Sequence, residues 1–248
     1  MKTIYILWLR QLKRYSRSKP RMIGSLAQPL LFLLSFSYGF GPIFQKAGQG
    51  SYLEFLAPGI IGMSIIFTSI FSGMEIIWDR QFGFLKETLA APVSRFNIMI
   101  GQTLGGATVA TMQGIIVFLI SMVAGFRPTN FMLIPGAILV MMLMALLFTA
   151  LGTAIASLLD DMQAFQLIIN FLVMPLFFLS GALFPLQDLP KAMVFIARLD
   201  PLSYGIDALR ILLVNLGHFG LLADLLVLFG VTGLFLAVGS YFFSKIQV

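Results

Sequence analysis

The chain has 248 residues, of which 59% are hydrophobic and 10% are charged. Soluble domains usually carry about 25% charged residues, so this composition excludes an ordinary soluble protein and indicates an integral membrane protein. The absence of cysteine and the single histidine exclude disulfides, thiolate metal sites and histidine metal clusters. The net charge of +6 comes from basic residues gathered beside the first hydrophobic run, so we expect no nucleic-acid partner.

Residues 1–21 predict an amphipathic helix that lies at the membrane interface. Its apolar side chains recur at helical spacing, while basic residues occupy the other faces; the apolar set is Ile4, Leu7, Trp8, Leu12 and Tyr15. Tryptophan and tyrosine rings suit the headgroup layer, so we expect contacts with membrane lipids. A simple positive-inside anchor and a regulatory element both fit this pattern.

Six hydrophobic runs are each long enough to cross a bilayer, for which about 20 residues suffice. They lie at 22–40, 58–78, 96–125, 131–159, 165–183 and 221–243. Continuous apolar runs, rather than alternating strands of about ten residues, exclude a closed barrel. We therefore predict an all-α membrane protein with six transmembrane helices, in one domain that covers residues 1–248.

The basic residues predict the orientation of these helices. Eleven of the 16 lysines and arginines precede the first run, follow the second run or lie after the last run, and five lie in the other connections. Lysine and arginine accumulate on the cytoplasmic side, so both termini are expected in the cytoplasm and the protein in the plasma membrane.

The connection at 184–220 is too long for a plain turn and too apolar for a solvated one. It contains a short helical pattern from Lys191 to Leu199. Asp200 as an N-cap and Pro201 at the first helical position then predict a second helix toward Val214. Segments of this length are typical of re-entrant or interfacial helices, so we predict an external helical hairpin before the last span.

A short amphipathic segment at residues 79–95 separates the second and third runs. Asp79 and Arg80 end the second run, Gly83 permits a turn along the surface, and Pro92 ends a short helix. Its mixture of charged and apolar side chains suits a protein partner. From residue chemistry alone, an inert cytoplasmic loop fits equally well.

This segment is one of four that carry a resemblance to a known family. The others are Phe55-Leu56-Ala57-Pro58-Gly59, Leu183-Phe184-Pro185-Leu186 and Asp200-Pro201-Leu202-Ser203-Tyr204. Over nearly its whole length the chain resembles the permease subunits of ATP-binding-cassette type-2 exporters, the drug-resistance branch in particular. The resemblance implies two permease subunits, expected as a homodimer, that work with two ATPase subunits.

The resemblance also implies that residues 79–95 form a coupling helix that docks on the ATPase. The residues expected at that contact are Asp79, Arg80, Gly83, Phe84, Lys86, Glu87, Pro92 and Arg95. The sequence has no Gly-x-x-x-x-Gly-Lys-Ser/Thr phosphate loop, so we expect no catalytic residue and no bound cofactor in this chain. ATP and Mg are expected on the partner ATPase.

Two further patterns concern helix packing. Gln163, Gln166 and Asn170 share one face of the fifth run, and this face either holds helices together or lines a substrate pathway. Gly101 and Gly105, four residues apart, predict the close approach of another helix.

The expected function is export of an amphiphilic drug or lipid, because the predicted lining is apolar with few fixed charges. Export of a polysaccharide or another polymer is the first alternative. An ion-driven secondary transporter would need an intramembrane ionisable relay or inverted repeats, and neither is visible in the sequence. A membrane assembly factor that transports nothing fits the composition but leaves residues 79–95 unexplained.

Overall fold

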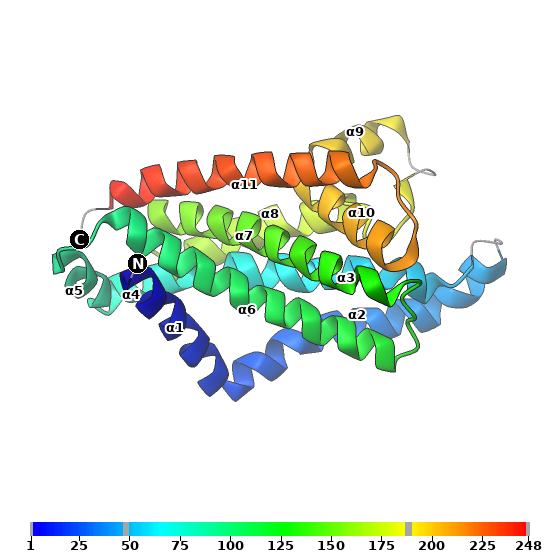
Figure 1. Ribbon diagram of the computed structural model, residues 1–248, viewed down its shortest axis with the longest axis horizontal. Helices are drawn as coiled ribbons and strands as arrows, with labels where there is room; N and C mark the ends of the chain where they lie inside the picture. The colour runs from blue at the N-terminus through cyan, green and yellow to red at the C-terminus, as the bar shows by residue number, and fades with distance from the viewer. Residues whose placement is uncertain (1, 47–49, 187–189, 247–248) are drawn as a thin grey trace.

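The computed structural model describes residues 2–46, 50–186 and 190–246, and within these ranges the chain is helical without strands (Figure 1). The helices are α1 (Lys2–Arg17), α2 (Lys19–Lys46), α3 (Tyr52–Ser72), α4 (Met74–Gln81), α5 (Phe84–Ala90), α6 (Arg95–Val123), the 3-10 turn η1 (Phe131–Leu133), α7 (Ile134–Leu158), α8 (Met162–Leu179), α9 (Lys191–Leu199), α10 (Pro201–Val214) and α11 (Leu221–Ser244).

Six helical segments among the described residues are long and apolar enough to cross a membrane, which confirms the predicted number. They are Met22–Lys46, Tyr52–Gln81, Arg95–Val123, Phe131–Leu158, Met162–Leu179 and Leu221–Ser244. The second begins at Tyr52 rather than at 58, because α3 continues through Pro58 at the loss of one backbone hydrogen bond. The fifth ends at Leu179 rather than at 183, because the chain turns at Gly181, whose φ is 76°.

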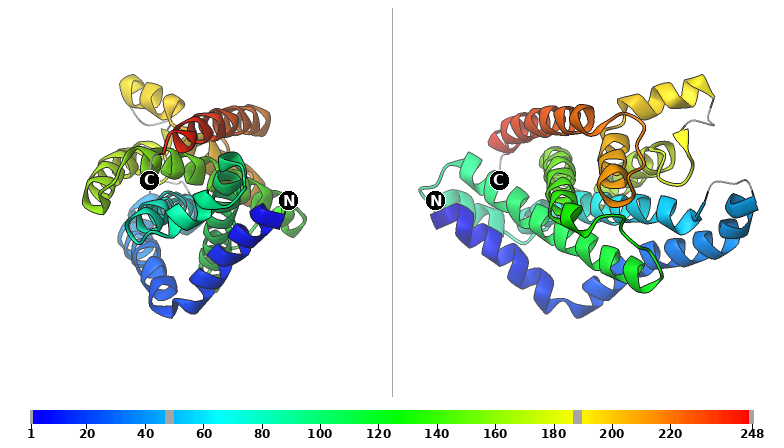
Figure 2. Two further views of the ribbon diagram at one scale, coloured as in Figure 1. Left: turned by 90° about the vertical axis from the view of Figure 1, so that its left-hand side faces the viewer. Right: turned by 45° about the vertical axis from the view of Figure 1, so that its right-hand side comes forward.

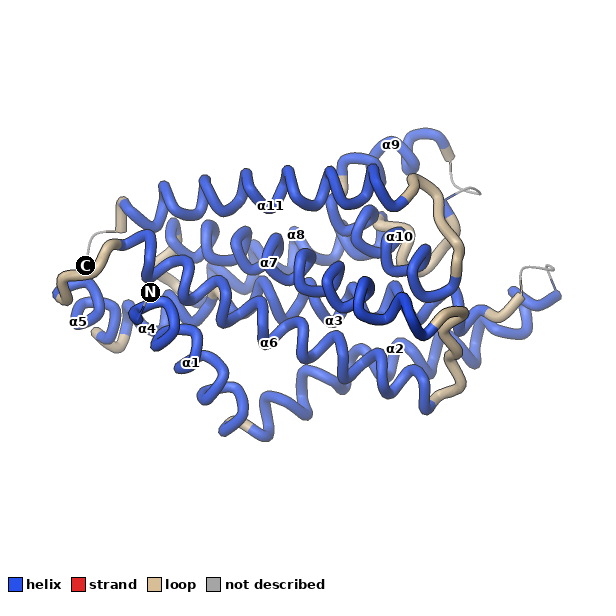
Figure 3. Tube along the Cα trace, in the orientation of Figure 1, coloured by secondary structure: helices blue, strands red, loops and turns tan. Residues whose placement is uncertain are grey.

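The long helices run side by side and form an elongated bundle (Figures 1 and 3). One end carries α5, the start of α1 and the end of α11, and we call it the α5 end. The opposite end carries α9 and α10, and we call it the α10 end. Helix α3 is the most buried span and packs against α2, α6, α7 and α10.

Small residues let the central helices approach closely. A Cβ atom on Gly73, at the junction of α3 and α4, would lie 2.5 Å from the carbonyl oxygen of Gly152 in α7. Real Cβ atoms do not approach other atoms so closely, so α3 and α7 meet backbone to backbone at this point.

The predicted N-terminal helix is α1, and it lies obliquely across α6 (Figure 1). Cβ atoms on Gly101 and Gly105 would lie 2.9 Å from Leu7 Cβ and 2.6 Å from Gln11 Cβ, respectively. The helix whose close approach these glycines predict is therefore α1. Trp8 Nε1 adds a 3.0 Å hydrogen bond to the Thr108 hydroxyl.

The two short helices predicted in the long connection are present as α9 and α10, with the expected bounds. The Asp200 side chain accepts a 2.8 Å hydrogen bond from the backbone N–H of Leu202, as an N-cap does. Helix α10 is buried against α3, α7 and α11, whereas α9 exposes Phe195 and Leu199.

Candidate functional site

The candidate site is the helix α5 and the turns on either side of it. Helix α4 ends at Gln81, and Gly83 turns the chain with a φ of 79°, a left-handed conformation that favours glycine. No atom lies within 4 Å of a Cβ built on Gly83, so backbone conformation rather than crowding requires glycine here. Helix α5 then stands at the tip of the α5 end (Figure 1).

The tip presents both apolar and charged side chains. The Phe82 ring is 80% exposed, and Lys86, Glu87 and Pro92 are also exposed. Leu85, in contrast, is buried and holds α5 against the bundle. An exposed aromatic ring among charges on a protruding helix is the composition of a contact surface for another protein.

Asp79 lies behind this tip and is buried, and it forms a partly exposed ion pair with α1. Arg10 donates from Nη1 and Nη2 to the two Asp79 carboxylate oxygens, each at 2.8 Å. Arg14 Nη1 lies 3.7 Å from Asp79 Oδ1 and 3.8 Å from Glu75 Oε2. The two arginines and the two acids are each four residues apart, so one face of α1 matches one face of α4.

Arg10 also connects α1 with α5. Its guanidinium carbon lies 3.7 Å from the centre of the Phe84 ring, and that of Arg14 lies 5.2 Å from the Trp78 ring. Charge-assisted bidentate pairs and cation–π contacts are among the stronger and more directional polar contacts in proteins. Helices α1, α4 and α5 are therefore fastened together.

Two further arginines fasten the segment to other helices. Arg80 forms an ion pair with Asp160 and donates a 3.3 Å hydrogen bond to the Leu159 carbonyl, in the turn between α7 and α8. Arg95 Nη1 donates to the carbonyls of Ser244 at 2.6 Å and Ile246 at 2.8 Å, at the end of α11.

The eight residues predicted at the partner contact thus occupy two different environments. Three of them face other helices of the same chain, namely Asp79, Arg80 and Arg95. Phe84 lies under Arg10, and Gly83 forms the turn. Lys86, Glu87 and Pro92 are accessible to a partner. Arg10 and Arg14 also belong to this site but were not predicted in it, although their spacing of four residues matches that of Glu75 and Asp79.

The amide residues predicted in the fifth span all lie on an uncovered side of α8. Gln163, Gln166 and Asn170 are exposed, as are the neighbouring Leu167 and Phe171. Within the described part of the chain, none of the three amide side chains forms a hydrogen bond. They therefore do not join helices of a single subunit through hydrogen bonds.

A buried charge stabilises the α10 end. Arg210 Nε donates to the Phe55 carbonyl at 3.2 Å, and Nη2 donates to the carbonyls of Gly181 and Ala182 at 2.8 and 3.1 Å. Burial lowers the pKa of Arg210 to about 10, and the negative charge of Asp207 opposes that shift. Asp207 itself accepts hydrogen bonds from the backbone N–H groups of His218 and Phe219.

The sequence is similar to those of several known proteins. The family model described as ABC-2 type transporter matches residues 2–214. A protein of Cyanophora paradoxa named as a transport permease, ycf38, is 30% identical over 216 residues, which are 84% of this chain and 73% of the relative. The ycf38 protein of Pyropia yezoensis is 32% identical, covering 79% of this chain and 68% of the relative. Nodulation protein J of Rhizobium leguminosarum bv. trifolii is 29% identical, covering 79% and 74%.

Proposed function

Because the chain belongs to the ABC-2 type transporter family, we propose that it is the permease subunit of an ATP-driven exporter and that a separate ATPase subunit docks on α5. The observation that carries this proposal is the exposed tip formed by α5 and the turn before it, where Phe82, Lys86 and Glu87 are exposed. Behind the tip, Arg10, Arg80 and Arg95 connect this segment to α1, to the turn between α7 and α8, and to α11.

The contacts behind the tip supply a route for movement. A push on α5 reaches α1 through Arg10, the turn between α7 and α8 through Arg80, and α11 through Arg95. Because packed helices move as rigid elements, these contacts convert a local push into a shift of several spans. Closure of the ATPase subunits would supply the push.

Catalysis is assigned to the partner in this proposal. ATP and Mg are bound by the ATPase subunit, and this chain contributes no catalytic group. Two copies of the chain, as a homodimer, enclose the pathway in the plasma membrane, with both termini and the α5 end in the cytoplasm. The basic residues before α2 and around α5 support this orientation.

The cargo that we propose is an amphiphilic drug or lipid. The uncovered face of α8 supports this choice, since it places the amides of Gln163, Gln166 and Asn170 beside Leu167 and Phe171. Such a face offers hydrogen bonds and apolar contact together. A polysaccharide or another polymer is the alternative cargo.

The docking of the ATPase is tested with the double variant Gly83→Val and Glu87→Arg. Valine strains the left-handed turn, and arginine reverses an exposed charge. We expect at least a tenfold loss of transport in proteoliposomes and of ATPase co-purification, which corresponds to about 1.4 kcal/mol or more. Lys191→Glu reverses an exposed charge at the α10 end and serves as the matched control. Wild-type transport and co-purification in a stably inserted double variant would refute the assignment.

The role of α8 is tested with Asn170→Leu. If this face lines the pathway, the variant keeps its dimer and its melting temperature but moves a different range of cargo. If the face joins two subunits, the variant dimer is weaker by about 0.6–2 kcal/mol, measured as its dissociation in detergent.

A further inference from the structure

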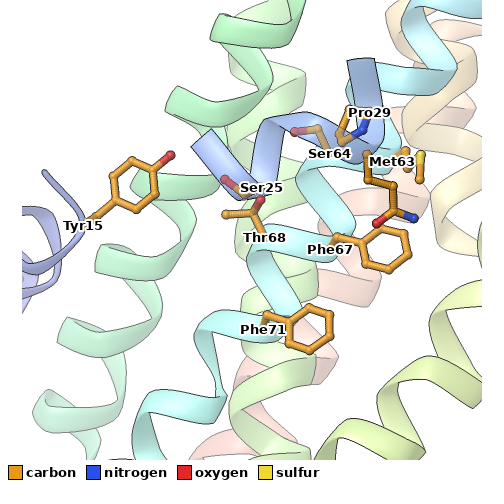
Figure 4. A pocket seen from close by; sticks show the side chains of 10 residues that line it. Tyr15, Ser25, Pro29, Met63, Ser64, Phe67, Thr68 and Phe71 are labelled. Carbon is orange, nitrogen blue, oxygen red and sulfur yellow. The ribbon is translucent and has the colours of Figure 1, made fainter. Parts of the chain in front are cut away.

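A cavity of about 360 Å³ lies between α2 and α3, next to the elbow at which α1 meets α2 (Figure 4). Polar groups from Ser25, Gln28 and Ser64 line it together with the rings of Phe67 and Phe71. Cavities that hold small molecules measure about 300–1,000 Å³, so this one is large enough for part of an amphiphile.

One hydroxyl in the cavity wall has no partner. The Ser64 side chain is 2% exposed, and its Oγ makes no hydrogen bond within the described residues. The oxygen itself is buried, so a ligand in the cavity would lie against the apolar side chains of the wall rather than against this hydroxyl.

A basic groove of about 720 Å³ follows the neighbouring face of α1. It is lined by four cationic side chains, Arg10, Lys13, Arg14 and Arg17, and ends at the elbow. Arg10 and Arg14 are occupied by Asp79 and Glu75. Neither Lys13 nor Arg17 forms an ion pair with another described residue, and both are exposed.

The groove and the cavity lie next to each other along α2. Pro20 lines the groove and Gly24 lines the cavity, and these two residues are one helical turn apart on the same face of α2. On the other wall, Phe71 lines the cavity, and Glu75, one helical turn further on, pairs with Arg14. Figure 2 shows the elbow of α1 and α2 standing out from the rest of the bundle, so membrane lipid can reach it from the side.

We propose that the elbow binds one membrane phospholipid with an anionic headgroup. The headgroup phosphate pairs with Lys13 and Arg17, and one acyl chain enters the cavity beside Phe67 and Phe71. Adjacent unpaired cations and an apolar cavity select a ligand that carries a negative charge and a hydrocarbon chain on one molecule. The proposal depends neither on the ATPase partner nor on the exported cargo.

The test measures fluorescence quenching by lipids with brominated chains. The chain has two tryptophans, so Trp8→Phe, Trp78→Phe and Phe71→Trp together leave one reporter in the cavity wall. The full-length chain is reconstituted in phosphatidylcholine with increasing brominated phosphatidylglycerol or brominated phosphatidylcholine. We expect half-maximal quenching at a mole fraction at least fivefold lower for the anionic lipid.

Two controls distinguish this site from general attraction of lipid. A reporter at Leu119, which is exposed on α6, should show no preference between the two lipids. Lys13→Gln with Arg17→Gln should abolish the preference at Phe71→Trp, whereas Lys191→Gln with Arg198→Gln should preserve it.

Two results would overturn the proposal. One is equal quenching by both brominated lipids when Lys13 and Arg17 are unchanged. The other is a preference for the anionic lipid that is not reduced by Lys13→Gln with Arg17→Gln. Native mass spectrometry of the wild-type chain provides a readout without a reporter. Bound phosphatidylglycerol should exceed bound phosphatidylcholine at least fivefold when both lipids are supplied equally, and an equal amount of each would also overturn the proposal.

Discussion

At the residue scale, Arg210 shows how one buried cation holds three chain segments. Its hydrogen bonds bind α10 to the Phe55 carbonyl of α3 and to the turn after α8. Its guanidinium also lies 3.8 Å from the centre of the Phe55 ring. Buried backbone carbonyls require such partners, so the side chain is structural and not merely a topological charge.

We expect Arg210→Met to lower the free energy of unfolding by about 3–5 kcal/mol, because three carbonyls lose their donor and Asp207 loses a balancing charge. The measurement is denaturant unfolding of the purified chain in detergent. Arg198→Met, at an exposed position on α9, should change this energy by less than about 0.5 kcal/mol. Equal stability of both variants would contradict the structural role of Arg210.

Asp200 predicts a dependence of stability on pH. Burial raises the pKa of Asp200 to about 7, whereas an unfolded aspartate titrates near 3.9. Between these pH values the folded chain retains a proton on Asp200 that the unfolded chain has released. The contribution of the protonated Asp200 to the free energy of unfolding is therefore complete below about pH 4 and is lost as the pH rises toward about 7.

The free energy of unfolding should therefore fall by on the order of 1 kcal/mol per pH unit between about pH 5 and pH 7. Asp200→Asn keeps an acceptor for the Leu202 N–H but cannot titrate, so its stability should lack this slope. Unfolding measured for both chains across this range tests the assignment, and parallel pH profiles would show that it is wrong.

At the element scale, the contact between α1 and α6 depends on glycines that leave room for a second backbone. Gly105→Val should displace α1, because a Cβ there would lie 2.6 Å from Gln11 Cβ. We expect a loss of about 1–3 kcal/mol and faster tryptic cleavage within α1. Gly230→Val, at an open position of α11, is the matched control and should leave α1 protected. Unchanged cleavage in Gly105→Val would contradict the packing role.

The elements that the sequence predicts well are those with local causes. Asp200 and Pro201 predict the start of α10 because an N-cap and a first-turn proline act within a few residues. The partners of Arg10 and Arg95 lie 69 and 149 residues away, respectively. No local pattern encodes these pairs, so the sequence alone does not predict that Asp79 and Arg95 contact other helices of the same chain.

At the scale of the whole molecule, the basic residues before α2 and around α5 lie toward one end of the bundle, away from α9 and α10 (Figure 1). We predict that the α5 end faces the cytoplasm. The cysteine-free sequence permits single labels, so Gln81→Cys should resist a membrane-impermeant thiol reagent in intact cells, whereas His218→Cys should react. Both positions are exposed, and the reverse labelling pattern would overturn the orientation.

The packing of α1 on α6 also has a consequence for biosynthesis. Helix α1 is translated first, but the surface on which it packs is formed by residues of α6, beginning at Gly101. Until the ribosome has released α6, Leu7 and Gln11 lack the α6 surface on which they pack, and the bilayer surface is available to the apolar stripe of α1. A nascent chain stalled before α6 should therefore be cleaved by trypsin within α1, and one stalled after α7 should be protected. On this schedule α1 reaches its final position against α6 only after the third span is inserted, although Asp79 and Phe84, which contact Arg10, are synthesised before α6.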